Sequence, residues 1–140
     1  MRDALKAGTA YSAIMFAIGF ALGTVRVLLL EPRLGPLAAV TMEVPVMLAL
    51  SWVVCDRLRR RWLPDAPLAD RAVMGASAFT LLMAAETALG IGLFGRTFGQ
   101  QLASYGTGAG ALGLAAQLAF AAFPVIQGRE LGTGRAAQDT

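Results

Sequence analysis

Four long apolar runs, each interrupted by one charged or amide side chain, dominate the hydrophobic pattern of this chain. The runs cover residues 9–30, 37–55, 72–94 and 108–126. A membrane core of about 30 Å requires roughly 20 apolar residues in helical form, and each run is about that long. The runs lack the two-residue alternation of a membrane barrel strand. Because backbone groups in lipid must satisfy their own hydrogen bonds, we expect four transmembrane helices.

Positive charge gathers in alternate connectors between these runs. The two connectors on the other side carry only Arg33 and Arg96. Basic segments flanking a membrane helix stay in the cytoplasm. We therefore expect an all-α membrane protein, a four-transmembrane-helix up-down bundle with the N and C termini cytoplasmic. The basic segments contain Arg2 and Lys6 at the N-terminus, Arg57, Arg59, Arg60, Arg61 and Arg71 in the central connector, and Arg129 and Arg135 in the tail.

Short connectors leave room for one domain. We assign residues 1–128 to a single four-helix transmembrane domain, and we expect residues 129–140, which are polar and small, to form a disordered cytoplasmic tail. The breaker-rich segment 31–36 predicts a tight turn, which makes the first two helices antiparallel. The first run has an alternative interpretation as a signal peptide, but it continues to Leu30 without a small-residue cleavage site.

Composition supports the membrane assignment and excludes several chemistries. Of the 140 residues, 56% are hydrophobic and 15% are charged, against roughly 25% charged in soluble domains. Of the 12 basic residues, all but Arg26 lie beside apolar runs, which indicates topology rather than nucleic-acid binding. Richness in Ala, Gly, Leu and Arg is typical of a GC-rich bacterial genome, so we expect a bacterial inner-membrane protein. With no histidine and one cysteine, Cys55, we expect no disulfide, no metal and no cofactor.

The polar residues inside the runs share one depth. Arg26, Glu43, Glu86 and Gln117 each lie between four and nine residues from the outer end of their run. At 1.5 Å per residue, all four lie roughly 6 to 14 Å below the outer interface. Ionisable groups at such depth avoid lipid and often mark a functional site. We therefore predict that these four side chains form a polar cluster inside the bundle.

Small residues and prolines accompany the cluster. Glycines at helical spacing share a face with the polar residues, and small residues allow close packing of membrane helices. Pro45 and Pro124 interrupt the second and fourth runs, and each predicts a kink because proline lacks the backbone donor. The predicted packing glycines are Gly19 and Gly23 beside Arg26, Gly90 beside Glu86, and Gly110 and Gly113 beside Gln117.

The charge state of the cluster has two interpretations. Arg26 and Glu43 form the expected ion pair, because their helices are joined by the short turn and a buried charge needs a partner. Glu86 beside Gln117 is then expected to be neutral, since burial disfavours the charge. Alternatively, Arg26 lies between both carboxylates, and the cluster carries a net charge of −1 that suits a proton or a small cation. In either charge state, the Arg26–Glu43 pair has a structural alternative, as a clamp that only holds the helices together.

Three functions follow from these features. The first is a small transporter or channel for a proton, cation or small solute, working as a homo-oligomer through the polar cluster. The second is a non-catalytic accessory or assembly subunit that docks against other membrane subunits. A lipid-modifying enzyme ranks third, since no nucleophile–base pair accompanies the carboxylates. The lipid bilayer is a partner in each case, with anionic lipid expected at Arg57, Arg59, Arg60 and Arg61.

Overall fold

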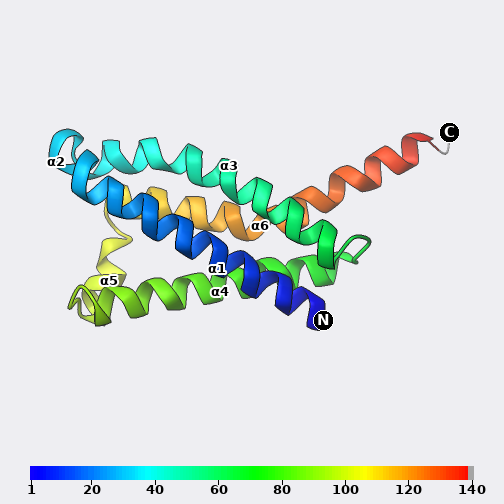
Figure 1. Cartoon of the computed structure of the whole chain (residues 1–140), viewed down its shortest axis with the longest axis horizontal. Coiled ribbons are helices and arrows are strands. Elements are labelled where there is room, and N and C mark those ends of the chain that lie inside the picture. The colour runs from blue at the N-terminus through cyan, green and yellow to red at the C-terminus, as the bar shows by residue number, and fades with distance from the viewer. Residues whose placement is uncertain (139–140) are drawn as a thin grey trace.

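All regular secondary structure in the described part of the chain is helical (Figure 1). This computed structural model describes the backbone of residues 1–138 and the side chains of residues 1–129. Four long helices are joined by short elements at their ends. The elements in chain order are α1 (Arg2–Val25), the π-helix η1 (Arg26–Leu30), α2 (Glu31–Leu34), α3 (Pro36–Trp62), α4 (Leu68–Gly92), α5 (Phe98–Ser104) and α6 (Gly108–Gln138).

Each long helix packs against two of the others. α1 contacts α3 and α4, and α6 contacts the same two helices from the other side. The short elements α2 and α5 lie at one end of the molecule, whereas the N-terminus and the connector between α3 and α4 lie at the other end (Figure 1). The long helices therefore surround a common axis, and residues from all four can meet there.

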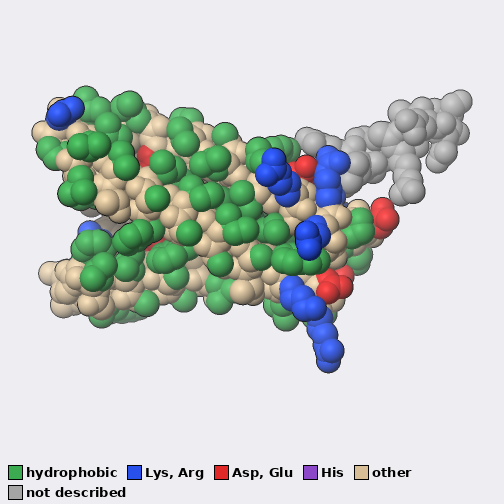
Figure 2. Space-filling model, in the orientation of Figure 1, with side chains coloured by type: hydrophobic (Ala, Val, Ile, Leu, Met, Phe, Trp, Pro, Cys, Tyr) green, Lys and Arg blue, Asp and Glu red, His purple; other side chains and the backbone are tan. Residues whose placement is uncertain are grey.

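Four helical stretches within residues 1–129 are long and apolar enough to cross a membrane: Arg2–Leu34, Pro36–Trp62, Leu68–Gly92 and Gly108–Arg129. Many large hydrophobic side chains on them point outward. Figure 2 shows these side chains spread over the length of the visible face, with arginine and lysine gathered at the end that carries the N-terminus. In water such a surface would be unfavourable, but in lipid it is the expected exterior. The fold is that of an all-helical membrane protein.

The connector between the first two long helices is tighter than the sequence indicates. Helical backbone continues beyond residue 30, through η1 and α2, to Leu34. Only Gly35 breaks it, with φ 83°, a left-handed conformation that glycine adopts without strain. Pro32 and Pro36 do not end helices here, since each lies in a first turn, where no backbone donor is required.

The C-terminal segment extends α6, and its disorder stays a prediction. α6 continues to Gln138, so most of the range 129–140 assigned to a disordered tail is helical in the structure. Residues 139 and 140 lie outside the described part. No proline follows Pro124, and a helix that is already formed extends at low cost. A polar composition alone does not stop such an extension.

Dense packing is confined to the half of the bundle that carries the N-terminus. Tyr11 stacks on Phe120 with ring centroids 4.0 Å apart, and the Tyr11 hydroxyl donates to the Phe120 carbonyl. Met15, Cys55 and Met74 complete this buried centre. Tyr11 comes from α1 and Phe120 from α6, so the stack bridges two helices that face each other across the bundle.

Two glycines that the sequence analysis did not single out make this packing possible. A Cβ on Gly8 would lie 2.0 Å from Ser77 Oγ, and one on Gly75 would lie 2.0 Å from the Ala121 carbonyl oxygen. The backbones of α1 and α6 therefore approach α4 at glycines. Ala4, Gly8 and Ser12 stand at four-residue spacing, which is the signal that identifies this face.

Candidate functional site

The other half of the bundle is hollow. A cavity of about 740 Å³ lies between α1, α3, α4 and α6, and residues of α5 and its flanking loops line its mouth. Figure 2 shows the molecule hollowed at this end. The floor is made by Met15 and Phe120, which also belong to the packed core. The cavity therefore opens toward the end with α2 and α5 and is closed below.

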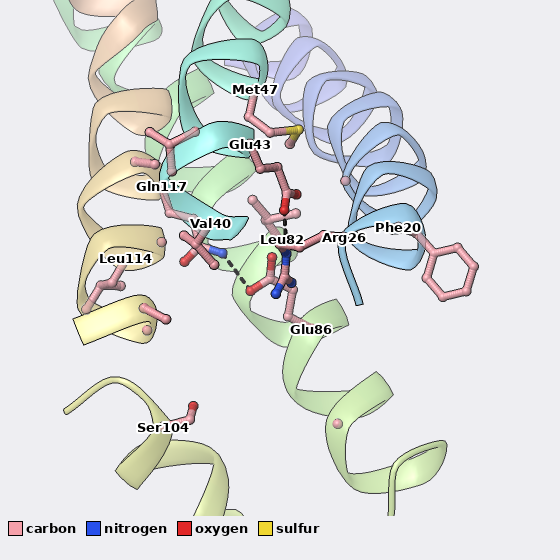
Figure 3. Close-up of a pocket in the computed structure, with 18 of the residues that line it drawn as sticks. Phe20, Arg26, Val40, Glu43, Met47, Leu82, Glu86, Ser104, Leu114 and Gln117 are labelled. Carbon is pink, nitrogen blue, oxygen red and sulfur yellow. Dashed lines mark hydrogen bonds and ion pairs between the residues drawn. The ribbon is translucent and has the colours of Figure 1, made fainter. Parts of the chain in front are cut away.

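All four residues of the predicted cluster line this cavity. Arg26, Glu43, Glu86 and Gln117 come from four different helices, η1, α3, α4 and α6, and their side chains project into the space between them (Figure 3). The structure thus brings together side chains that are far apart in sequence. They form two pairs: an ion pair between Arg26 and Glu43, and a hydrogen bond between Gln117 and Glu86.

Arg26 pairs with two carboxylates. Its Nη1 contacts Glu31 Oε1, and its Nε contacts Glu43 Oε2. Glu43 is the partner expected from the sequence, but Glu31 was not anticipated. Five residues of α-helix would turn Glu31 about 140° away from Arg26. The π-helix changes this geometry, because its backbone bonds join residues five apart, and the Glu31 amide donates to the Arg26 carbonyl.

Glu86 and Gln117 form the second pair. Gln117 Nε2 donates to Glu86 Oε2 at 2.6 Å (Figure 3). Gln117 Oε1 is buried and accepts no hydrogen bond from any described residue. Within residues 1–129, Glu86 makes no ion pair, and Arg26 is shared by Glu31 and Glu43 instead. Glu86 is therefore the carboxylate that lacks a cation.

The cavity is acidic as a whole. Three carboxylates line it, those of Glu31, Glu43 and Glu86, against the two guanidinium groups of Arg26 and Arg96. Arg96 lies in the loop before α5, where its Nη1 donates to Gln101 Oε1 at 3.4 Å. With every carboxyl ionised, the lining carries a net charge of −1. Arg96 stands at the mouth, so the uncompensated negative charge lies deeper, beside Glu86.

The five glycines predicted to pack helices all line the cavity. Three of them allow close approach: a Cβ on Gly19 would lie 3.3 Å from Met47 Cε, one on Gly90 2.5 Å from Gln101 Oε1, and one on Gly110 1.9 Å from the Ser104 carbonyl oxygen. A Cβ on Gly23 would touch only Arg26 Nη2, at 3.8 Å.

Gly113 departs most from the prediction. A Cβ there would meet no atom within 4 Å, so this glycine packs against no neighbouring helix and faces open space. Its absent side chain enlarges the cavity above Gln117, because Gly113 lies one helical turn away from Gln117 on the same face of α6.

Pro45 and Pro124 both lie inside continuous helices, α3 and α6. Pro124 is fully buried, which identifies it as part of the packed half. The kinks expected at the two residues remain predictions. Pro45 lies two residues from Glu43, so any bend there would alter the position of that carboxylate.

At the basic end of the molecule, fewer arginines are available to bind anionic lipid than the sequence indicates. Arg59 is 3% exposed and donates to Asp56 at 3.1 Å, and Arg60 pairs with the same carboxylate at 2.9 Å. The buried Arg59 does not face lipid, which removes it from the predicted anionic-lipid site. Arg57, Arg60 and Arg61 are exposed and keep that prediction.

Comparisons with known proteins return no family for this chain. No protein-family model, curated protein or solved structure matches it. Within residues 1–129 no three His, Cys, Asp or Glu side chains are grouped so that they can hold a metal ion. The function therefore has to be inferred from the cavity itself and from the side chains that line it.

Proposed function

We propose that the protein is a small membrane transporter whose cavity binds a proton or a cationic solute at Glu86 and Gln117. The observation that supports this proposal most strongly is the presence of a carboxylate without a cation in a cavity of about 740 Å³. Placing an ionisable group inside a membrane bundle is costly, and such groups are usually retained for transport or proton transfer. Arg26 sets the charge of the cavity by neutralising part of Glu31 and Glu43.

We place the basic end of the bundle in the cytoplasm of a bacterium, following the charge asymmetry of the connectors. The bundle is then of the up-down type with both termini inside, and the cavity opens toward the outer face of the inner membrane. The connectors at the opposite end support this orientation, because Arg33 and Arg96 are the only basic residues in them.

The closed floor favours a transporter over a channel. Below the polar residues, the Tyr11–Phe120 stack and Met15 fill the axis of the bundle. A continuous pore is therefore absent from the described residues, and passage requires α1 or α6 to shift. We expect a homo-oligomer, since a bundle of only four membrane-spanning helices leaves little room for such a movement within one chain.

Flux into proteoliposomes tests the proposal. Vesicles with an entrapped pH dye, and separately with labelled cations and small amines, are compared for the native protein and Glu86→Gln. We expect flux that the substitution reduces at least tenfold, because it removes the one unpaired carboxylate. Asp3→Asn is the matched control, since Asp3 is exposed at the opposite end of the molecule. Equal flux through the Glu86→Gln and native proteins would refute the proposed site.

The accessory-subunit hypothesis is decided by a separate measurement. Gentle solubilisation from native membranes, followed by mass spectrometry, reveals whether the protein purifies alone. Stoichiometric recovery with an unrelated membrane complex, together with absent flux, would replace the transporter proposal. Recovery as a homo-oligomer with flux would support it.

A further inference from the structure

The cavity wall is layered along the bundle axis. The polar layer consists of Glu43, Glu86 and Gln117. One helical turn below it, on the same faces of the same helices, lie Met47, Leu82 and Phe120, and all three also line the cavity. One turn is about 5.4 Å. A ligand that fills both layers needs a polar head about one turn away from an apolar group.

The polar layer contains unused hydrogen-bond acceptors. Gln117 Oε1 is buried and unpartnered, and no described residue donates to the second carboxylate oxygen, Glu86 Oε1. Buried acceptors are normally satisfied, and an unsatisfied one costs free energy. The buried Gln117 Oε1 and the second carboxylate oxygen of Glu86 lie on side chains that contact each other, so a ligand that donates two hydrogen bonds fits this layer. Within residues 1–129 Glu86 makes no ion pair, so its ionised form favours a cationic ligand.

We propose that the ligand is a primary organic ammonium ion that carries a compact apolar group. The ammonium donates to Glu86 and to Gln117 Oε1, and the apolar group lies against Met47, Leu82 and Phe120. The Phe120 ring adds a face that attracts cations and packs against aromatic groups. A volume of about 740 Å³ falls within the range of small-molecule sites. This inference rests on the proposed function, which it narrows to amines.

Other cations fit the layers less well. A metal ion or a proton alone leaves the apolar layer empty. A quaternary ammonium ion has no N–H donor, so Gln117 Oε1 would stay unsatisfied. A neutral alcohol donates one hydrogen bond and leaves the carboxylate without a cation. The primary ammonium ion is the one among these that satisfies charge, donors and apolar surface together.

Binding of labelled 2-phenylethylammonium to the purified oligomer, measured by equilibrium dialysis against empty detergent micelles, tests this inference. We expect saturable binding that 2-phenylethanol and trimethyl(2-phenylethyl)ammonium compete for at least tenfold more weakly. Glu86→Gln should weaken binding tenfold or more, and Gln117→Leu about tenfold, the size of one hydrogen bond to a charged group. Equal competition by the quaternary ion would overturn the role of Gln117, and equal competition by the alcohol would overturn the ammonium assignment.

Glycine variants keep the test decisive if a polar variant fails to fold. Gly113→Leu places a side chain in the cavity, and Gly92→Leu is its match, because a Cβ at Gly92 also meets no atom within 4 Å and Gly92 does not line the cavity. We expect loss of amine binding only for Gly113→Leu, with native helix content and oligomer size in both. Unchanged binding in Gly113→Leu would place the amine elsewhere and refute the inference.

The flux assay separates this inference from the proposed function. Proton or inorganic-cation flux that depends on Glu86, without any amine binding, would remove the ligand class and leave the transporter intact. Amine binding that depends on Glu86, without any flux, would remove transport and leave the ligand class intact.

Discussion

Arg26 controls the balance of charge among the cavity side chains, because it pairs with two carboxylates at once. Replacing it with leucine leaves Glu31 and Glu43 facing each other without a cation. Breaking a fully buried pair costs about 3 to 5 kcal/mol, and the Arg26 side chain is still 25% exposed. We therefore expect Arg26→Leu to lower the free energy of unfolding by about 2 kcal/mol, measured by reversible denaturant titration in mixed micelles.

The partners of Arg26 supply the control for this prediction. Adding Glu31→Gln and Glu43→Gln to Arg26→Leu removes the stranded charges, so we expect most of the lost stability to return. Arg33→Leu, which removes an exposed arginine near the same end, should leave stability unchanged. A triple variant no more stable than Arg26→Leu would show that the ion pairs are not the cause.

We expect alanine to have opposite effects on stability at Gly75 and at Gly113, although both glycines lie in membrane helices. A Cβ on Gly75 would overlap the Ala121 carbonyl oxygen of α6, which is backbone and cannot move aside. We expect Gly75→Ala to lower the free energy of unfolding by about 1 to 3 kcal/mol, whereas Gly113→Ala should leave it unchanged or slightly increase it. Equal unfolding free energies for the two variants would contradict the packing described for α4 and α6.

Single residues show how far sequence reasoning reaches. The depth of Arg26, Glu43, Glu86 and Gln117 follows from counting along apolar runs, and that count is sufficient to expect them at one level. Depth alone does not identify which side chains touch. Glu31 contacts Arg26 because a π-helix lies between them, and no residue pattern predicts that helix. Gly75 is needed for close packing because Ala121 of α6 lies opposite it.

At the scale of elements, α5 covers part of the cavity mouth, and its N-terminus is capped by Thr97, the residue before it. Thr97 and Gln100 form a reciprocal capping box, with the Gln100 amide donating to Thr97 Oγ1 and the Thr97 amide to Gln100 Oε1. Loss of such a cap costs about 1 kcal/mol. For a helix of seven residues we expect Thr97→Ala to increase hydrogen exchange across 98–104.

Thr80→Ala is the control for the cap. Thr80 also makes a hydrogen bond, to the Ala76 carbonyl, but it lies within α4, where the hydrogen-bonded backbone does not depend on it. We expect native exchange in this variant. Unchanged exchange across 98–104 in Thr97→Ala would show that contacts of Gln101 and Gly90, rather than the cap, hold α5 in place.

The existence of the long helices was predictable, but their ends were not. Apolar length alone identifies four segments, because lipid permits little else. The segment 31–36 was wrongly interpreted as a turn, since proline also stabilises the first turn of a helix, and only Gly35 changes direction. Helix ends depend on local capping and on neighbours, which a hydropathy pattern does not contain.

For the molecule as a whole, the separation into a packed and a hollow half is the feature with the most consequences. Small residues let α1, α4 and α6 close around Tyr11 and Phe120 in one half. In the other half, polar residues and open glycines leave space. A ligand can reach the polar layer from the open side without any change in packing. To reach it from the closed side, the Tyr11–Phe120 stack has to repack.

The orientation of this asymmetry in the membrane can be measured directly. Cys55 is the single cysteine of the chain and is fully buried, so Cys55→Ala gives a background without thiols. A cysteine is then placed at Gly99, in α5, or at Pro64, in the connector between α3 and α4. Both positions are exposed, and they lie at opposite ends of the bundle (Figure 1).

Intact cells are treated with a membrane-impermeant maleimide. Since basic segments stay inside, we expect Gly99→Cys to be labelled in intact cells and Pro64→Cys to be labelled only after lysis. The reverse pattern would show that the cavity opens toward the cytoplasm, and Glu86 would then receive its ligand from inside the cell. Labelling of both cysteines in intact cells would contradict the membrane-spanning arrangement itself, because each would then be reached without crossing lipid.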